Sequence, residues 1–153
     1  MNLYLMRHGE PNKTSPDENR TLTKEGESKL FSAATGWLPL VGMFDHILCS
    51  PYKRTSQTAE IVKIIFQHMP EIIVDNNLKP GCRSEYIEEM IEILEGDNIL
   101  FIAHDPDLTY HISYFTGNSE INPMYYGSFA KISFGDNPPR KGLGKLDFIM
   151  EVK

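Results

Sequence analysis

The chain has 153 residues, 41% of them hydrophobic, with a formal net charge of −6 and a pI near 5.3. This length suffices for one domain with a substantial core and is too short for two ordinary domains, so we expect residues 1–153 to form a single domain. An acidic chain without a basic stripe argues against nucleic acid as a partner, and the absence of a long apolar stretch argues against insertion in a membrane.

The cysteine and histidine content predicts a reduced, metal-free protein. Cys49 and Cys82 are too few for a disulfide framework and form no CxxC pair. The chain starts in a predicted strand rather than in a signal peptide, so we expect a soluble cytoplasmic protein with both thiols reduced. Because His46, His68 and His111 lack the spacing of metal ligands, we expect neither a metal nor another cofactor.

Short apolar runs alternate with longer amphipathic segments along the chain. The pattern predicts strands at 2–6, 44–49, 72–74 and 99–103, helices at 23–38, 51–68, 84–94 and 106–116, and a terminal hairpin of strands 128–134 and 145–152. Such alternation is typical of an α/β fold. We therefore predict a three-layer α/β/α sandwich with a mostly parallel central sheet and antiparallel edge strands.

The segment Leu5–Glu10, with the sequence LMRHGE, follows the first predicted strand directly. An imidazole attacks phosphorus well when it is neutral, held in one tautomer, and aimed at a phosphate whose charge fixed donors neutralise. Arg7 and His8 have the side chains for both tasks. The alternative is a buried arginine–histidine pair that serves only to end a strand.

A second segment, Ser50–Glu60, follows the predicted strand 44–49. Ser50 is a good N-cap, and Pro51 suits the first position of a helix. Arg54 is then expected in the first helical turn, where free N–H groups and the helix dipole favour an anion. Its planar guanidinium can hold two phosphate oxygens at once. The alternative is a solvated arginine on a well-capped surface helix.

Two further segments carry polar residues at predicted strand or helix ends. His104 follows the apolar run 98–103, which reads as a strand buried on both faces. Thr23 is predicted to cap the helix 23–38, and Gly26 in its first turn permits a close approach of another backbone. In an α/β fold, the ends of the parallel strands are the place where ligands gather.

Four of these segments resemble signatures of the histidine phosphatase superfamily, also called the phosphoglycerate mutase-like family. They are L-x-R-H-G at 5–9, L-T-x-x-G at 22–26, S-P-x-x-R-x-x-Q-T-A at 50–59, and the histidine after the run 98–103. The resemblance covers nearly the whole chain and implies a phosphoglycerate mutase-like fold. It also implies a phosphatase in which His8 becomes a covalent phosphohistidine while Arg7, Arg54 and His104 hold the phosphoryl oxygens.

The resemblance leaves three further residues with two interpretations each. Arg20 matches an arginine of the small phosphohistidine phosphatases and is a candidate phosphate or substrate cation, or a loop arginine in water. Asp105 forms a His-Asp pair like that of the phytase and acid phosphatase branch, where the aspartate protonates the leaving group. Because Pro106 follows it, Asp105 also fits an N-cap. Glu10 is a further candidate acid.

The expected substrate class depends on a helical insertion that many relatives have and this chain lacks. Relatives that act on sugar phosphates or phosphoglycerate generally carry a helical insertion between the second arginine and the second histidine, and here the interval is short, so we expect no large lid. The resemblance is therefore nearest to SixA-type enzymes that remove phosphate from phosphohistidine on a protein. The alternatives are a phosphatase of small phosphomonoesters, a mutase-like enzyme, and a non-catalytic phosphate-binding regulatory module. The partner would be a phosphorylated protein or a small phosphomonoester, and the sequence predicts no oligomeric state.

Overall fold

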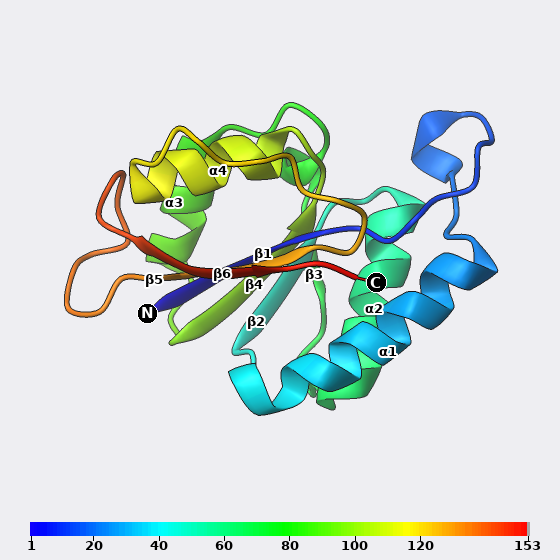
Figure 1. Cartoon of the computed structure of the whole chain (residues 1–153), viewed down its shortest axis with the longest axis horizontal. Coiled ribbons are helices and arrows are strands. Elements are labelled where there is room, and N and C mark those ends of the chain that lie inside the picture. Colours follow the sequence, from blue (N-terminus) through cyan, green and yellow to red (C-terminus); the bar gives the residue numbers. More distant parts are fainter. Residues whose placement is uncertain (153) are drawn as a thin grey trace.

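The computed structural model describes residues 1–152, which contain a six-stranded sheet in the order β3-β2-β4-β1-β5-β6 (Figure 1). The strands are β1 (Asn2–Arg7), β2 (His46–Cys49), β3 (Ile73–Val74), β4 (Asn98–Ala103), β5 (Phe129–Ser133) and β6 (Lys145–Met150). The neighbours β1–β4, β4–β2 and β2–β3 are parallel, whereas β5 and β6 form an antiparallel hairpin beside β1. The predicted mixed α/β sheet is thus confirmed.

Helices cover both faces of this sheet. They are α1 (Lys24–Val41), α2 (Lys53–Phe66), α3 (Ser84–Ile93) and α4 (Asp107–Thr116), with short 3-10 turns η1 (Asp17–Asn19) and η2 (Asn76–Leu78). Helices α1 and α2 pack together on one side of the sheet and α3 and α4 on the other (Figure 1). The predicted three layers are therefore present.

The alternation of side chains along β1 explains why there are two cores. Leu3 and Leu5 point to the core beneath α3 and α4, whereas Tyr4 and Met6 point to the core beneath α1 and α2. All four side chains are at most 1% exposed, because a central parallel strand is buried on both faces. The apolar sequence of β1 is thus a consequence of its place in the middle of the sheet.

The carboxyl ends of β1, β2 and β4 lie next to one another. Arg7 pairs with Ala103, and Cys49 pairs with Ile102, so the next residue of each strand emerges at the same edge. These next residues are His8, Ser50 and His104. The strand register therefore brings three distant segments of the sequence to one place.

The element boundaries differ from the prediction by a few residues. Helix α1 continues through Pro39 to Val41, and the N–H of Gly42 donates to the carbonyl of Leu38 at its end. Helix α2 ends at Phe66, before the predicted residue 68, because Gln67 adopts a left-handed conformation with φ of 50°. The hydrophobic pattern of the sequence alone does not locate the ends of helices, since the last helical turn depends on what the helix packs against.

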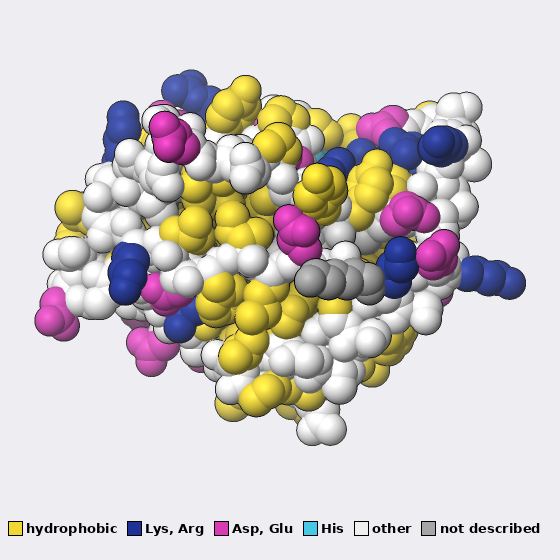
Figure 2. Space-filling model, viewed as in Figure 1, with side chains coloured by type: hydrophobic (Ala, Val, Ile, Leu, Met, Phe, Trp, Pro, Cys, Tyr) yellow, Lys and Arg dark blue, Asp and Glu magenta, His cyan; other side chains and the backbone are white. Residues whose placement is uncertain are grey.

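The surface carries charges of both signs. On the face shown in Figure 2, basic and acidic side chains are interspersed among apolar ones, and they form no continuous basic stripe on that face. Across residues 1–152, none of the helices is both long enough and apolar enough to pass through a membrane. Cys49 and Cys82 are both free thiols.

Candidate active site

His8 lies directly after β1 and is only 4% exposed. Its Nδ1 is 2.7 Å from the carbonyl oxygen of Gly9, which can only accept, so Nδ1 carries a proton and donates it. In the neutral imidazole Nε2 then has the free lone pair, and it accepts a hydrogen bond of 3.2 Å from Nε of Arg54. The backbone thereby fixes the tautomer in which Nε2 is the nucleophilic atom.

The surroundings of His8 favour the neutral imidazole. Burial is the largest cause, and the nearby His104, Arg54 and Arg7 add to it. Together they outweigh the Gly9 hydrogen bond and lower the pKa of His8 to about 3. The side chain is therefore an unprotonated base at neutral pH, as an attack on phosphorus requires.

Arg54 lies in the first turn of α2 with its side chain 6% exposed. Besides the contact with His8, its NH1 donates to the backbone carbonyl of Asp17 at 2.7 Å, and its NH2 donates to Oδ2 of Asp17 at 3.2 Å. The guanidinium also lies over the ring of Tyr52, 4.9 Å from its centroid. Arg54 thus connects the imidazole of His8 to the segment η1.

Arg7 approaches the site from the end of β1. Its NH1 donates to the carbonyl oxygen of Met124 at 2.8 Å, and its guanidinium carbon lies 4.2 Å from the ring centroid of Tyr126. Its Nε is buried and has no hydrogen-bond partner within residues 1–152. The Tyr126 ring also lies 5.7 Å from the His8 ring, so this tyrosine flanks both groups.

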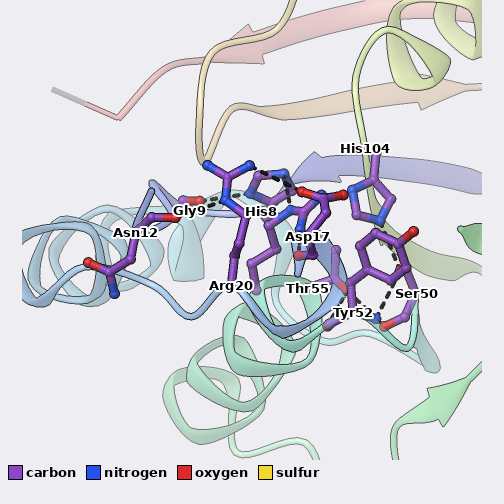
Figure 3. Close-up of polar contacts among 10 residues, drawn as sticks. His8, Gly9, Asn12, Asp17, Arg20, Ser50, Tyr52, Thr55 and His104 are labelled. Atoms are coloured by element: carbon purple, nitrogen blue, oxygen red, sulfur yellow. Dashed lines mark hydrogen bonds and ion pairs between the residues drawn. The ribbon is translucent and has the colours of Figure 1, made fainter. Parts of the chain in front are cut away.

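His104 follows β4, and its ring centroid is 5.4 Å from that of His8. Its Nε2 is 2.9 Å from Oγ of Ser50, which itself accepts a hydrogen bond from the N–H of Tyr52 (Figure 3). We assign the serine hydrogen to this contact, which leaves Nδ1–H of His104 as a buried donor with no partner in the described chain. Burial and then the charge of Arg54 lower the pKa of His104 to about 4, so it is neutral as well.

Ser50 does not cap α2, contrary to the prediction. The helix begins at Lys53 after Tyr52, and no side chain makes an N-cap hydrogen bond there. The reason is that the hydroxyl of Ser50, three residues before the first helical residue Lys53, is engaged between the N–H of Tyr52 and the ring of His104. The residue therefore orients a histidine, which local capping rules do not anticipate.

Other residues of the recognised segments hold the loops together. Thr58 Oγ1 accepts from the N–H of Gly9 at 3.1 Å, and Gln57 Oε1 accepts from the N–H of Leu22 at 2.7 Å. Thr23 caps α1 as predicted, accepting from the N–H of Gly26 at 2.9 Å. A Cβ on Gly26 would lie 2.8 Å from a backbone carbonyl, that of Glu10, so the close approach expected at this glycine is present.

Arg20 reaches the site indirectly. Its Nε donates to the carbonyl of Asn12 at 2.8 Å, and its NH1 donates to Oδ1 of Asp17 at 3.2 Å (Figure 3). Asp17 in turn contacts Arg54, so the three side chains form a row. Asp17 was not among the predicted site residues. Its spacing of three residues from Arg20 is compatible with that ion pair, but nothing in the sequence indicates the contact with Arg54.

The two candidate acids have other partners. Oδ1 of Asp105 accepts from both the N–H and the hydroxyl of Thr109 in α4, and Oδ2 accepts from the N–H of Met124 at 3.2 Å. Asp105 is nevertheless not the N-cap of α4, because the helix starts at Asp107 and its N-cap is Pro106, so Asp105 lies one residue too early. Because the carbonyl of Met124 holds Arg7, Asp105 also supports that arginine. Glu10 is exposed and accepts from the Thr23 hydroxyl at 3.1 Å.

A pocket of about 400 Å³ lies beside Gly9, which follows His8, and beside Tyr126, whose ring is 5.7 Å from that of His8. It is lined by Gly9, Glu10, Gly26, Lys29, Leu30, Tyr125, Tyr126, Glu151 and Val152. The residues around the site offer no metal-ligand set, and nowhere in the described chain do three histidine, cysteine or carboxylate side chains cluster to hold a metal ion. The arrangement therefore offers a neutral nucleophile, two cations and a second imidazole beside an open pocket.

Comparison with solved structures supports the fold. The structure of the protein histidine phosphatase SixA complexed with tungstate has a TM-score of 0.89 at 21% identity, over 99% of this chain and 97% of that one. A SixA from Agrobacterium tumefaciens, described as a putative phosphohistidine phosphatase, has a TM-score of 0.82 at 18% identity, over 97% and 96%. A mycobacterial glucosyl-3-phosphoglycerate phosphatase has a TM-score of 0.72 at 14% identity, over 95% and 96%.

Comparison at the sequence level identifies the family. A search of curated proteins gave no match. The family model described as histidine phosphatase superfamily (branch 1) matches residues 3–80, slightly more than half of the chain, and these residues include Arg7, His8 and Arg54. The chain is a phosphatase that belongs to the histidine phosphatase superfamily.

Proposed function

We propose that this phosphatase removes phosphate from phosphohistidine on a protein, through a covalent phosphohistidine on His8. The observation that carries the proposal is the state of His8. Its Nδ1 proton is held by the Gly9 carbonyl at 2.7 Å, and its Nε2 faces Arg54 at 3.2 Å. A buried, neutral imidazole whose lone pair lies on one defined nitrogen beside an arginine is suited to attack a phosphate once Arg54 turns from that nitrogen to the phosphoryl oxygens.

The proposed reaction has two displacements at phosphorus. In the first, the lone pair of His8 Nε2 forms a bond to phosphorus while the bond from phosphorus to the substrate nitrogen breaks, and that nitrogen takes a proton from solvent. In the second, a water oxygen bonds to phosphorus and the bond to Nε2 breaks, which releases inorganic phosphate and restores the neutral imidazole. The groups that stabilise the charge on the phosphoryl oxygens are Arg7, Arg54 and His104.

Two of these groups have donors free for the phosphoryl oxygens. Nε of Arg7 and Nδ1 of His104 are buried without a partner in the described part of the chain. An unpaired buried donor is unfavourable, so a bound oxygen that accepts from either group would gain a well-directed hydrogen bond. Arg20 is the third cation of the proposal, as a ligand of the phosphate or of the substrate, and in the structure it pairs with Asp17, which also pairs with Arg54.

Two features of the described chain support a protein substrate: no inserted helical segment lies between α2 and β4, and no general acid is positioned beside His8. Between α2 and β4 the chain contains only β3, η2 and α3, and no added helix covers His8. Within the described chain, neither Asp105 nor Glu10 has a side-chain hydrogen bond to His8, Arg54 or His104. A phosphoramidate leaves as a weakly basic imidazole and needs little help from an acid, whereas a phosphomonoester loses a poor alkoxide leaving group.

The second candidate function is hydrolysis of a small phosphomonoester. The pocket of about 400 Å³ beside Gly9 favours it, because that volume can hold the organic part of a small substrate next to the phosphate. Glu10 lines this pocket and is the acid that such a reaction would use.

The test compares phosphate release by the wild type and His8→Ala from a phosphohistidine-bearing carrier protein and from a panel of small phosphomonoesters at matched concentration. We expect preference for the carrier and loss of turnover in the variant. Preference for a monoester, with Glu10→Gln reducing it, would move the assignment to a small-molecule phosphatase. Near-normal turnover by His8→Ala would exclude the covalent mechanism, and phosphate binding without any turnover would indicate a regulatory module.

A further inference from the structure

The carboxylate of Asp17 occupies the site in the manner of a bound anion. Oδ1 lies 3.2 Å from NH1 of Arg20, and Oδ2 lies 3.2 Å from NH2 of Arg54. In Figure 3 the Asp17 side chain lies between those of Arg20 and His104. Two carboxylate oxygens shared between two guanidinium groups reproduce the contacts that two phosphoryl oxygens would make there.

These contacts engage all three nitrogens of Arg54 and occupy three of its five N–H donors. Its Nε donates to Nε2 of His8, while NH1 and NH2 donate to the backbone and side-chain oxygens of Asp17. The lone pair of His8 that must attack phosphorus is therefore covered by Arg54. In this arrangement the nucleophile is correctly oriented but blocked.

We propose that Asp17 is a positioning residue that holds Arg54 on the nucleophile in the ligand-free enzyme and is displaced from both arginines when a phosphoryl group enters. The inference rests on the proposed phosphatase function. Displacement of Asp17 turns Arg54 from His8 toward the phosphoryl oxygens, which frees Nε2 for attack. Asp17 thereby competes with an incoming anion for the two arginines. Only an anion that binds these arginines more strongly than Asp17 does releases Arg54 from His8.

The energetics favour exchange with a phosphoryl dianion over exchange with weaker anions. The Asp17 side chain is 53% exposed, so it returns to water easily when it leaves the arginines. A phosphoryl group has up to two negative charges and three acceptor oxygens, and it can satisfy both arginines and the free Nδ1–H of His104. A carboxylate ligand has one charge and two oxygens and thus gains nothing over Asp17.

The neighbouring Glu18 offers a matched control. It is a carboxylate in the same 3-10 turn and is also exposed, but none of its contacts within the described chain reaches Arg20 or Arg54. Asp17→Asn and Glu18→Gln therefore remove the same charge from the same segment. Only the first removes the competitor for the two arginines.

The experiment measures binding of inorganic phosphate by isothermal titration calorimetry to the wild type, Asp17→Asn and Glu18→Gln, together with KM and kcat on whichever substrate the wild type uses. We expect Asp17→Asn to bind phosphate roughly fivefold more tightly and to show a lower KM, with Glu18→Gln close to the wild type. A merely structural role for Asp17 would instead lower the melting temperature and kcat without any gain in phosphate affinity.

Each outcome separates this inference from the proposed function. Equal phosphate affinity in all three proteins, alongside normal turnover by the wild type, overturns the inference and leaves the phosphatase proposal in place. Tighter phosphate binding by Asp17→Asn in a protein that turns over no substrate supports the displacement and refutes the catalytic proposal. Asp17→Ser provides the same comparison should the asparagine variant lose its native near-UV circular dichroism.

Discussion

The protonation state of His8 follows from burial and from the few groups that surround its imidazole. The carbonyl of the next residue, Gly9, takes the Nδ1 proton, while burial, the largest cause, and the positive side chains nearby keep a second proton off the ring. A lowered pKa of about 3 means that protonation of the folded protein at His8 occurs well below pH 5. The imidazole that we propose as the nucleophile is therefore unprotonated over the whole physiological range.

Ring nitrogen chemical shifts from NMR provide a direct check. Between pH 7.5 and 5 we expect the His8 ring to show one neutral tautomer, with the proton on Nδ1 and no titration. The resonance is assigned by its disappearance in His8→Asn. A midpoint near 6.5, the ordinary histidine value, or a proton on Nε2 would contradict this description.

Arginine rather than lysine is required at position 54. The planar guanidinium donates from three nitrogens in three directions, which a single ammonium group on a flexible chain does not reproduce. We expect Arg54→Lys to lower kcat/KM by roughly 10²- to 10³-fold, the range for loss of a well-placed donor. Arg83→Lys, at an arginine whose side chain is 81% exposed, is the control and should keep wild-type kinetics. Similar kcat/KM for both variants would show that only the charge at position 54 matters.

At the scale of the elements, the site depends on a few hydrogen bonds that join loops to α2. Thr58 is fully buried, and its hydroxyl donates to the carbonyl of Arg54 at 2.7 Å while accepting from the N–H of Gly9 at 3.1 Å. It thereby ties the loop that carries the nucleophile to the helix that carries the second arginine. This connection explains why a threonine at position 58, in the S-P-x-x-R-x-x-Q-T-A segment, is useful to the site.

Replacement of Thr58 by valine tests the connection. The variant keeps the shape of the side chain but leaves the buried N–H of Gly9 unpaired, so we expect a loss of about 1 to 3 kcal/mol in the free energy of unfolding and reduced turnover. Urea denaturation measures the first and steady-state assays the second. Thr35→Val is the matched control, because the exposed Thr35 has only the equivalent hydrogen bond to a carbonyl of its own helix, that of Phe31. If both variants unfold at the same urea concentration, the hydrogen bond between Thr58 and Gly9 does not contribute to the free energy of unfolding.

At the scale of the whole molecule, buried histidines make the protein sensitive to acid. Burial is the main cause that lowers the pKa of His8 to about 3 and those of His104 and His111 to about 4. Below the ordinary value near 6.5 the unfolded chain takes up protons at these residues, whereas the folded chain does not. The folded state is thus stabilised fully above pH 6.5 and loses stability as the pH falls from 6.5 toward 4.

His111 allows this prediction to be tested outside the site. It lies in α4 with Nδ1 2.7 Å from Oγ of Ser84 and is 1% exposed. Each such histidine contributes a slope of up to about 1.4 kcal/mol per pH unit in the window between the two pKa values. We expect the unfolding free energy of His111→Asn, measured by urea denaturation at several pH values from 7 to 4.5, to fall less steeply than that of the wild type. Parallel curves for the two proteins would refute the assignment.

The sequence by itself determined the parts of the molecule that local chemistry controls. Alternation of apolar runs with amphipathic segments was sufficient for the α/β class, and four segments taken together indicated the family, which the match over residues 3–80 confirms. Thr23 could be identified as a helix cap because capping involves residues only three positions apart. Helix ends such as Val41 and Phe66 were predicted less well, since packing decides them.

The tertiary structure alone decided which groups meet. The role of Ser50 depends on the register of β2 and β4, which places its hydroxyl against His104 rather than on α2. Asp17 and Tyr126 come from polar loops, and nothing in their sequence neighbourhood indicates that they lie beside Arg54 and Arg7. Hydrogen bonds and charge contacts across distant segments depend on distances that only the folded backbone sets, whereas strand and helix formation depends on neighbours along the chain.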